Sequence, residues 1–207
     1  MTDDRGDRPA RRLALVRSID DASATPYDEA THVAGVQRRN EDVFTALVRA
    51  YIDPLTTFAF GCLGDEDAAH DVVQEVFARV WQLGAAWNPT SGIAAYLFAA
   101  VRHRAYSVIR ANQSRERMQR AVTTDMGPTA MEQDPYLDLT LVAFVQRELE
   151  HLTERQRDVL RLRFEQGHTM AQVAAILGID LRTAERVAAR GFTALRTKLD
   201  AFRKRLG

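Results

Sequence analysis

The residues best suited to binding chemistry lie between positions 181 and 190. Arginine can pair with guanine edges or with phosphates, and glutamate can accept a hydrogen bond from cytosine. Small and apolar residues recur at helical spacing in this stretch and just after it, and would pack inward: Ala184, Val187, Ala188, Gly191 and Leu195. The polar residues that remain outward are candidates for contact with the major groove of DNA: Arg182, Thr183, Glu185, Arg186 and Arg190.

Two capping boxes predict the helices that must position these side chains. Thr153 is followed three residues later by Gln156, and Thr169 in the same way by Gln172. In each pair the hydroxyl can accept an N–H of the first turn while the amide reaches back to the cap. The stretch 152–199 therefore predicts three helices with two tight connections.

Further residues in this stretch complete a helix-turn-helix pattern. Val159, Leu160 and Phe164 recur at helical spacing, Gly178 can end the second helix and Asp180 can cap the third. An eight-residue helix, a glycine turn and a longer helix are typical of this motif. The alternative is an ordinary amphipathic helix with a solvated charged face.

A second basic region follows a predicted helix over about 93–112. Residues 102–120 contain six arginines and one acid, Glu116. The aromatic residues Trp87, Tyr96 and Tyr106 lie among or just before them. Cations for phosphates and rings for unstacked bases are what a single-stranded DNA site uses. The alternative is a solvated helix whose aromatic residues belong to the core.

The helix predicted over about 67–83 is the most sharply amphipathic segment. Its apolar side comprises Val72, Val73, Val76, Phe77, Val80 and Trp81. Its polar side comprises Asp71, Gln74, Glu75 and Arg79. Acidic residues in the first turns agree with the helix dipole, so a solvated face over a core helix explains this pattern.

The rest of the chain predicts an all-α protein with two small helical domains. Residues 1–39 lack a sustained period and read as a disordered arm, and Asn40 can cap the helix that follows. Asp53 followed by Pro54 predicts a restart of that helix, with Pro in the first turn. Residues 121–135 lack periodicity and contain two prolines, which indicates a flexible linker.

The totals exclude several classes of function. Lysines and arginines number 28 and so do the acids, so the net charge of zero argues against a wholly basic nucleic-acid coat protein. A single cysteine, Cys62, fits a reducing cytoplasm, and no apolar run suits a membrane span or signal peptide. The histidines are scattered, and no phosphate loop or nucleophile elbow is present, so we expect no metal, no cofactor and no enzyme activity.

Three segments together resemble a bacterial RNA polymerase sigma factor of the extracytoplasmic-function type. They are DVVQEVFARVW over 71–81, AAYLFAAVRHRAYSVIR over 94–110 and the helix-turn-helix stretch. The resemblance implies a region 2-like domain over 40–118, a linker over 119–135 and a region 4-like helix-turn-helix domain over 136–207. The arm 1–39 is longer than usual.

The resemblance also implies roles for matching residues. The surface that docks on the β′ clamp helices of core polymerase would include Asp71, Gln74, Glu75, Phe77 and Trp81. The side chains that capture and follow the −10 element would be Trp87, Asn88, Ser91, Tyr96, Arg102, Arg104 and Arg110. Those entering the −35 major groove would be Arg182, Thr183, Glu185, Arg186 and Arg190.

The implied partners are core RNA polymerase, through its β′ clamp helices and β flap, promoter DNA and an anti-sigma factor. The function implied is promoter recognition and melting in the cytoplasm. The alternative is a helix-turn-helix regulator that binds duplex DNA without joining polymerase. Asp180, Thr183–Ala184, Glu185 and Gly191 depart from the usual family residues, so the −35 sequence cannot be read by analogy.

Overall fold

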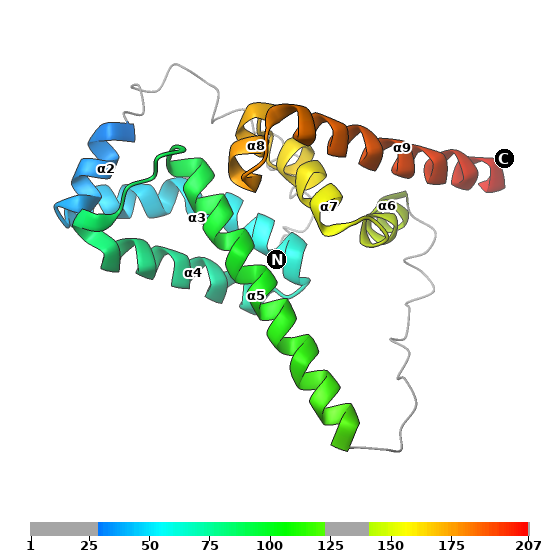
Figure 1. Cartoon of the computed structure of the whole chain (residues 1–207), viewed down its shortest axis with the longest axis horizontal. Helices are drawn as coiled ribbons and strands as arrows, with labels where there is room; N and C mark the ends of the chain where they lie inside the picture. The colour runs from blue at the N-terminus through cyan, green and yellow to red at the C-terminus, as the bar shows by residue number, and fades with distance from the viewer. Residues whose placement is uncertain (1–28, 123–140, 207) are drawn as a thin grey trace, which may run out of the picture.

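The computed structural model describes residues 29–122 and 141–206, and within these ranges every regular element is a helix (Figure 1). The first unit comprises α2 (Glu29–Gln37), α3 (Glu41–Leu63), α4 (Glu66–Leu83), the 3₁₀ turn η1 (Gly84–Ala86) and α5 (Ile93–Val122). The second comprises α6 (Leu141–Glu150), α7 (Glu154–Leu160), the π turn η3 (Arg161–Glu165), α8 (Met170–Leu177) and α9 (Leu181–Leu206). The all-α, two-unit prediction is confirmed.

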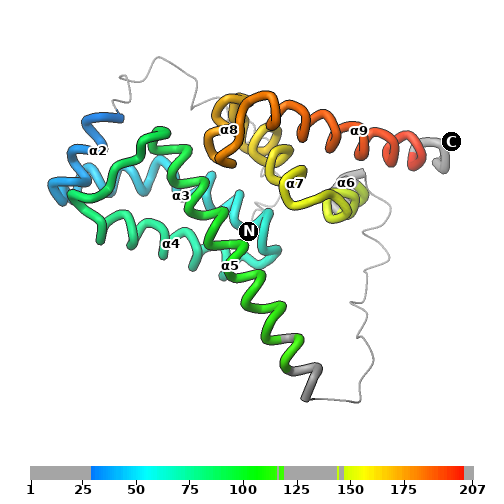
Figure 2. The backbone as a smooth tube through the Cα atoms, viewed as in Figure 1, coloured from blue at the N-terminus to red at the C-terminus, as the bar shows by residue number. Residues whose placement is uncertain are grey.

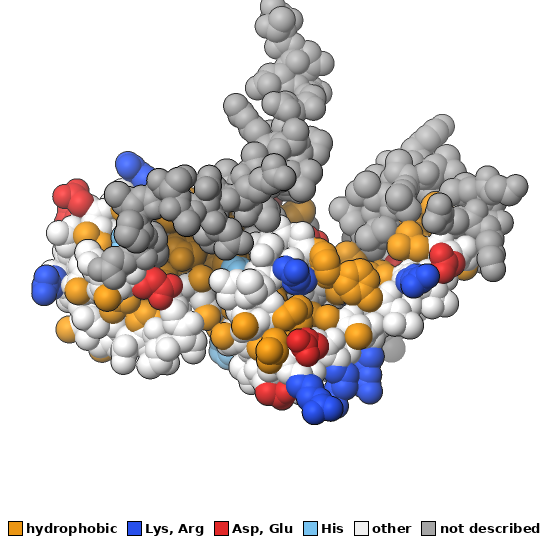
Figure 3. Space-filling view, turned by 90° about the horizontal axis from the view of Figure 1, so that it is seen from above, with side chains coloured by type: hydrophobic (Ala, Val, Ile, Leu, Met, Phe, Trp, Pro, Cys, Tyr) orange, Lys and Arg blue, Asp and Glu red, His pale blue; other side chains and the backbone are white. Residues whose placement is uncertain are grey.

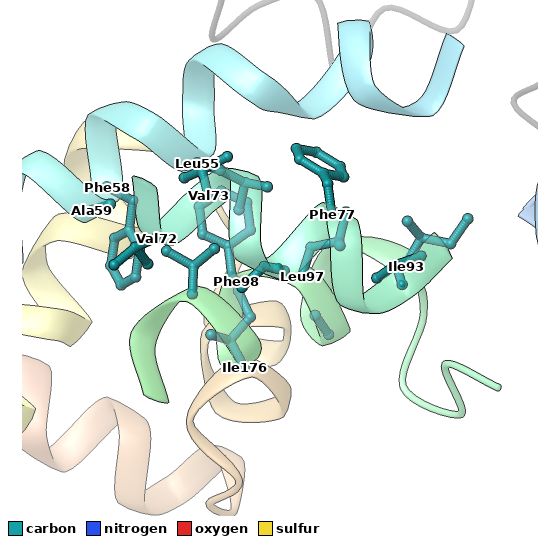
Figure 4. Packing of buried hydrophobic residues seen from close by; sticks show 14 of the residues in the cluster. Leu55, Phe58, Ala59, Val72, Val73, Phe77, Ile93, Leu97, Phe98 and Ile176 are labelled. Atoms are coloured by element: carbon teal, nitrogen blue, oxygen red, sulfur yellow. The ribbon is translucent and has the colours of Figure 1, made fainter. Parts of the chain in front are cut away.

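The first unit is built on α3, α4 and α5, which pack against one another, with α2 against α3 and η1. Asn40 Oδ1 accepts the Val43 N–H at 3.0 Å and starts α3, as predicted. Asp65 Oδ1 accepts the Ala68 N–H at 2.8 Å and starts α4. The core includes Phe58 on α3, whose ring meets the ring of Phe98 edge-on at 5.5 Å (Figure 4).

Helix α3 corrects one sequence prediction. It runs without interruption through Pro54, where the sequence predicted a restart. A proline inside a helix removes one backbone hydrogen bond and strains the turn before it. Burial of Leu55, Phe58 and Ala59 directly after it keeps this face of the helix on the core, and tertiary packing overrides the local signal.

Helix α2 corrects a second prediction, because residues 29–37 were assigned to a disordered arm. Only Val36 is fully buried on α2, so the helix has almost no amphipathic pattern to read. Gly35 allows α2 to approach α3 closely, since a Cβ at this position would lie 2.6 Å from a Val43 methyl carbon. Residues 1–28 lie outside the described ranges.

The second unit confirms the predicted caps. At Thr153 and at Thr169 the hydroxyl accepts an amide N–H and the glutamine three residues later accepts the cap N–H. Gly178, with φ of 62°, ends α8 in the left-handed conformation. Asp180 Oδ1 then accepts the Thr183 N–H at 2.8 Å at the start of α9.

Phe164 does not share the burial of Val159 and Leu160, with which it recurs at helical spacing in the sequence. The segment after α7 winds as the π turn η3, which has more residues per turn than an α-helix. This shift buries Leu162 completely and leaves Phe164 56% exposed, where its ring meets that of Phe192 at 4.8 Å. A period of 3.6 residues could not anticipate this change.

Helix α5 is longer than the sequence predicted, since it continues past residue 112 to Val122. It therefore includes the first residues of the predicted linker. The tube in Figure 2 shows its C-terminal part extending away from the packed helices. Its N-terminal half lies between the two units, because it packs on α3 and α4 of the first and on α8 of the second.

Candidate nucleic-acid interface

The N-terminal half of α9 presents the predicted base-reading side chains. Ala184 is fully buried, and α9 packs on α7 and α8 through this side. Hydrogen bonds from Thr183 hold the pKa of Asp180 below its ordinary value, so the cap stays charged at neutral pH. Thr183 itself is half-buried. The exposed members of the predicted set are Arg182, Glu185, Arg186 and Arg190.

Exposed apolar side chains also occur on the second unit. In the part of the surface over α7–α9, Figure 3 shows hydrophobic side chains beside lysine and arginine side chains. Phe192 on α9 is 47% exposed and Leu181 is 46% exposed. The basic character of α9 is therefore interrupted by apolar contact area.

The polar side of α4 lies on the surface of the first unit. Asp71, Gln74 and Glu75 are exposed, as predicted from the amphipathic pattern. The other two residues assigned to this surface behave differently. Phe77 is only 5% exposed, and half-buried Trp81 packs against Phe44 with 4.8 Å between ring centroids. Phe77 is thus a core residue that holds α4 on α3, which corrects its predicted direct contact.

An ion pair joins α4 to α5. Arg104 donates from Nε to one carboxylate oxygen of Glu75 and from Nη2 to the other, the latter at 2.9 Å. The hydrogen bond from Arg104 lowers the pKa of Glu75. Both side chains are about half exposed, so the pair is screened by water and contributes little to stability. It links a residue predicted to bind polymerase to one predicted to follow DNA.

The loop between η1 and α5 corrects the prediction for Trp87. This side chain is completely buried, so it cannot contact a base in this arrangement. The ring of half-buried Tyr96 meets it edge-on at 5.9 Å. Asn88 and Ser91 are exposed and remain available as contacts. The buried Trp87 side chain therefore anchors the loop to the core.

Helix α2 holds this loop at both ends, which the sequence did not predict. Gln37 Nε2 donates to the Trp87 carbonyl at 2.8 Å. Glu29 Oε1 accepts the N–H of Ile93, the first residue of α5, at 3.3 Å. Gly92, with φ of 88°, lies against the same carboxylate. These contacts join residues 50 and 64 positions apart, so no local pattern could have revealed them.

The basic side of α5 is divided between solvent and the second unit. Arg104 and Arg110 are exposed, whereas the Arg102 side chain is 27% exposed. Arg102 Nε donates to Asp158 Oδ2 at 2.7 Å, and the hydroxyl of Tyr106 donates to Asp158 Oδ1 at 2.9 Å. Asp158, on α7, was not among the predicted residues. An acid directly before the buried pair Val159 and Leu160 is the sequence signal that could have indicated it.

Within residues 29–122 and 141–206, no group of three His, Cys, Asp or Glu side chains is placed to hold a metal ion. None of the helices in the described part of the chain combines the length and apolar character that a bilayer span needs. The features present are exposed basic residues on two helices, an acidic row on α4 and a helix-turn-helix. These define a DNA-binding protein of two helical units.

Comparison with known families places both units. The model for Sigma-70 region 2 matches residues 47–115, and the model for Sigma-70, region 4 matches residues 149–197. The ECF RNA polymerase sigma factor SigK of Mycolicibacterium vanbaalenii is 30% identical over 170 residues, covering 78% of this chain and 84% of the relative. SigX of Bacillus subtilis, also an ECF sigma factor, is 26% identical over 171 residues, covering 80% of this chain and 88% of the relative.

The chain therefore belongs to the ECF family of RNA polymerase sigma factors. It is a sigma factor that binds core RNA polymerase and directs promoter recognition and melting. The alternative of a helix-turn-helix regulator that never joins polymerase is not favoured, because it leaves the region 2 match over 47–115 unexplained.

Two solved structures share the fold. CnrH, in complex with the cytosolic domain of CnrY, superposes with a TM-score of 0.62 at 23% identity and covers 83% of this chain and 96% of its own. RpoE of Bartonella quintana, in complex with the anti-sigma factor NepR, superposes with a TM-score of 0.57 at 24% identity and covers 76% and 96%. Both matches extend over the two units.

Proposed function

We propose that three exposed surfaces of the protein act in transcription initiation, and that each binds a different partner: core polymerase, the −10 element or the −35 element. The exposed row of Asp71, Gln74 and Glu75 on α4, flanked by half-buried Trp81, docks on the β′ clamp helices. The support is its exposure and its position on the helix that matches region 2. Phe77 contributes by fixing α4 on the core.

The −10 element is then received by the loop before α5 and by the exposed side of that helix. Asn88 and Ser91 lie at the loop surface, and Tyr96 borders it. Arg104 and Arg110 are placed to follow phosphates. Arg102 joins them only when it is released from Asp158. A flipped base costs a few kcal/mol of unstacking, approximately, which these contacts offset.

The −35 element is read by α9. The observation that carries this assignment is the capped start of α9, which directs Arg182, Glu185 and Arg186 outward while Ala184 packs inward. Arg190 extends the same exposed side by one turn and Thr183 borders it.

Separate assays of polymerase binding and −35 binding test these assignments. The double variant Asp71→Asn, Glu75→Gln is expected to weaken binding to purified core polymerase and leave −35 duplex binding unchanged. A matched control, Glu41→Gln with Asp42→Asn, removes two exposed acids from the first turn of α3. Equal loss in both variants would contradict the docking assignment.

The reciprocal variant is Arg186→Ala, which is expected to weaken −35 binding and leave core affinity unchanged. Its control is Arg196→Ala, which removes an exposed arginine from the same helix more than two turns further on. The duplex probe comes from mapped transcription start sites after overexpression, which also yields both promoter elements. If the two variants lose −35 affinity equally, Arg186 has no special role.

We also propose control by an anti-sigma factor, supported by the likeness to RpoE, which was solved with the anti-sigma factor NepR. Affinity purification of the tagged chain from its native cells should yield a protein that blocks transcription by the reconstituted holoenzyme.

The sigma factor itself is proposed to act in the cytoplasm and to catalyse no reaction. The domain that binds polymerase and the −10 element spans 29–122 rather than 40–118, and 141–206 belong to the −35 domain.

A further inference from the structure

The contact between the two units is centred on one buried carboxylate. The Asp158 side chain on α7 has no exposed surface, and each of its oxygens accepts a hydrogen bond from α5 of the other unit. Arg102 supplies one bond at 2.7 Å and Tyr106 the other at 2.9 Å. A buried charge is tolerated only when it is paired and hydrogen-bonded. Asp158 lies on α7, and α5 of the other unit supplies its hydrogen-bond donors.

Apolar packing surrounds this contact. Ile176 of α8 belongs to the same buried cluster as Phe98 of α5, and Figure 4 shows the two side chains adjacent. The ring of Phe98 also meets the His168 ring edge-on at 4.6 Å. The Arg161 side chain lies against α3 at Gly61, where a Cβ on residue 61 would be 3.1 Å from the Arg161 Nε. The two units therefore share one continuous core.

The neighbouring titratable groups agree with a dry interface. Burial, and secondarily the Asp158 charge, raise the pKa of the Tyr106 hydroxyl, so it remains a hydrogen-bond donor at neutral pH. The same two causes raise the pKa of the Cys62 thiol to about 12. With Tyr106 and Cys62 neutral, the Arg102 guanidinium is the cation that pairs with the Asp158 side chain, at 2.7 Å.

This contact and DNA binding compete for the same side chain. Arg102 is the predicted phosphate contact nearest the start of α5, yet its Nε is committed to Asp158 and 27% of the side chain is exposed. Its guanidinium also lies 5.0 Å from the centre of the Tyr106 ring, which α7 covers. A DNA strand following α5 would have to displace α7 to reach either residue.

We propose that the two units form a self-inhibited closed state, latched by Asp158 on Arg102 and Tyr106, which must open before Arg102 can bind promoter DNA. The proposal rests on the proposed function for the role of Arg102. It requires no second protein. In the open state Asp158 is hydrated, so its replacement penalises the closed state alone.

Small-angle scattering by the full chain tests the latch without reference to DNA. The variants Asp158→Asn, Tyr106→Phe and Arg102→Ala are each expected to increase the radius of gyration, with Tyr106→Phe giving the smallest change. The control Asp200→Asn removes an exposed acid from α9 and leaves the radius unchanged. Circular dichroism confirms that each variant retains its helices. An unchanged radius for folded Asp158→Asn, or for Tyr106→Phe if the former is unfolded, overturns the proposal.

Binding of a fluorescein-labelled, mixed-sequence 20-nucleotide single strand tests the competition. While the closed state dominates, apparent affinity scales with the open fraction, so Asp158→Asn should bind at least about tenfold more tightly. Arg102→Ala should open the protein without this gain, because it lacks the phosphate contact. Expansion of Asp158→Asn without tighter binding would support the latch but contradict the proposed DNA role of Arg102. The scattering measurement therefore tests the latch, and the binding measurement tests the DNA role of Arg102, so either can be contradicted without the other.

Discussion

Replacing Thr169 by alanine removes the cap that starts α8, the first helix of the helix-turn-helix. In the structure Thr169 Oγ1 accepts the Gln172 N–H at 3.2 Å, and Gln172 Oε1 accepts the Thr169 N–H at 2.8 Å. Alanine eliminates the first bond, leaves a backbone donor of the first turn without its acceptor and frees the glutamine from its reciprocal geometry. The expected loss is about 1 kcal/mol of unfolding free energy.

The same substitution within a helix should not destabilise the protein. Thr193 lies in the middle of α9, is exposed, and donates its hydroxyl hydrogen to the Ala189 carbonyl at 2.9 Å. Thr193 does not cap a helix end, so its replacement leaves no first-turn N–H without an acceptor. Alanine is also the better helix former by up to about 0.7 kcal/mol. Thr193→Ala should therefore be neutral or slightly stabilising.

Urea unfolding of the full chain, followed by circular dichroism, measures both changes. With slopes of about 1–3 kcal/mol per molar, a loss of about 1 kcal/mol lowers the midpoint by roughly 0.3–1 M. The slope itself should not change, because both variants expose the same surface on unfolding. If Thr169→Ala and Thr193→Ala have the same midpoint, the reciprocal cap contributes nothing and the reasoning fails.

Three further predictions follow from the site. Trp87→Ala should lower the unfolding free energy by about 3–5 kcal/mol, because it empties a fully buried site; loss of DNA binding at unchanged thermal stability would contradict this. Arg104 lowers the pKa of Glu75, so the ion pair stabilises the fold above the pKa of Glu75 in the unfolded chain and loses this effect as the pH falls through its pKa in the folded protein. The unfolding free energies of wild type and Arg104→Ala should therefore converge in acid. A difference that stays constant with pH would exclude the ion pair as its cause. If Arg186 contacts a phosphate, Arg186→Ala should reduce the slope of log affinity against log salt by about 0.9 for −35 duplex, whereas an unchanged slope would point to base contact.

The helix starts were predictable because their signals are local. Thr153, Thr169 and Asp180 bond to amides three residues away, so the residues that form each cap lie within one turn of sequence. The amphipathic stripe of α4 was predictable for the same reason, since its valines repeat at the helical period. These features identified the helix-turn-helix and the exposed row that begins at Asp71.

The missed features depend on partners far along the chain. The role of Asp158 depends on Arg102 and Tyr106, which are 56 and 52 positions away. The loop that contains buried Trp87 is held by α2, a helix with a single fully buried residue and hence no readable stripe. The exposure of Phe164 follows from a π turn, which changes the period within a helix.

The contacts of α2 have a consequence for chimeric sigma factors. The match to region 2 begins at residue 47, yet Glu29 and Gln37 hold the loop that precedes α5. A graft of region 2 cut at residue 40 would carry the exposed loop residues Asn88 and Ser91 to a new host without the two side chains that hydrogen-bond the backbone on either side of them. Promoter specificity in such hybrids should then depend on where the cut is made, and a junction placed before residue 29 should transfer it intact.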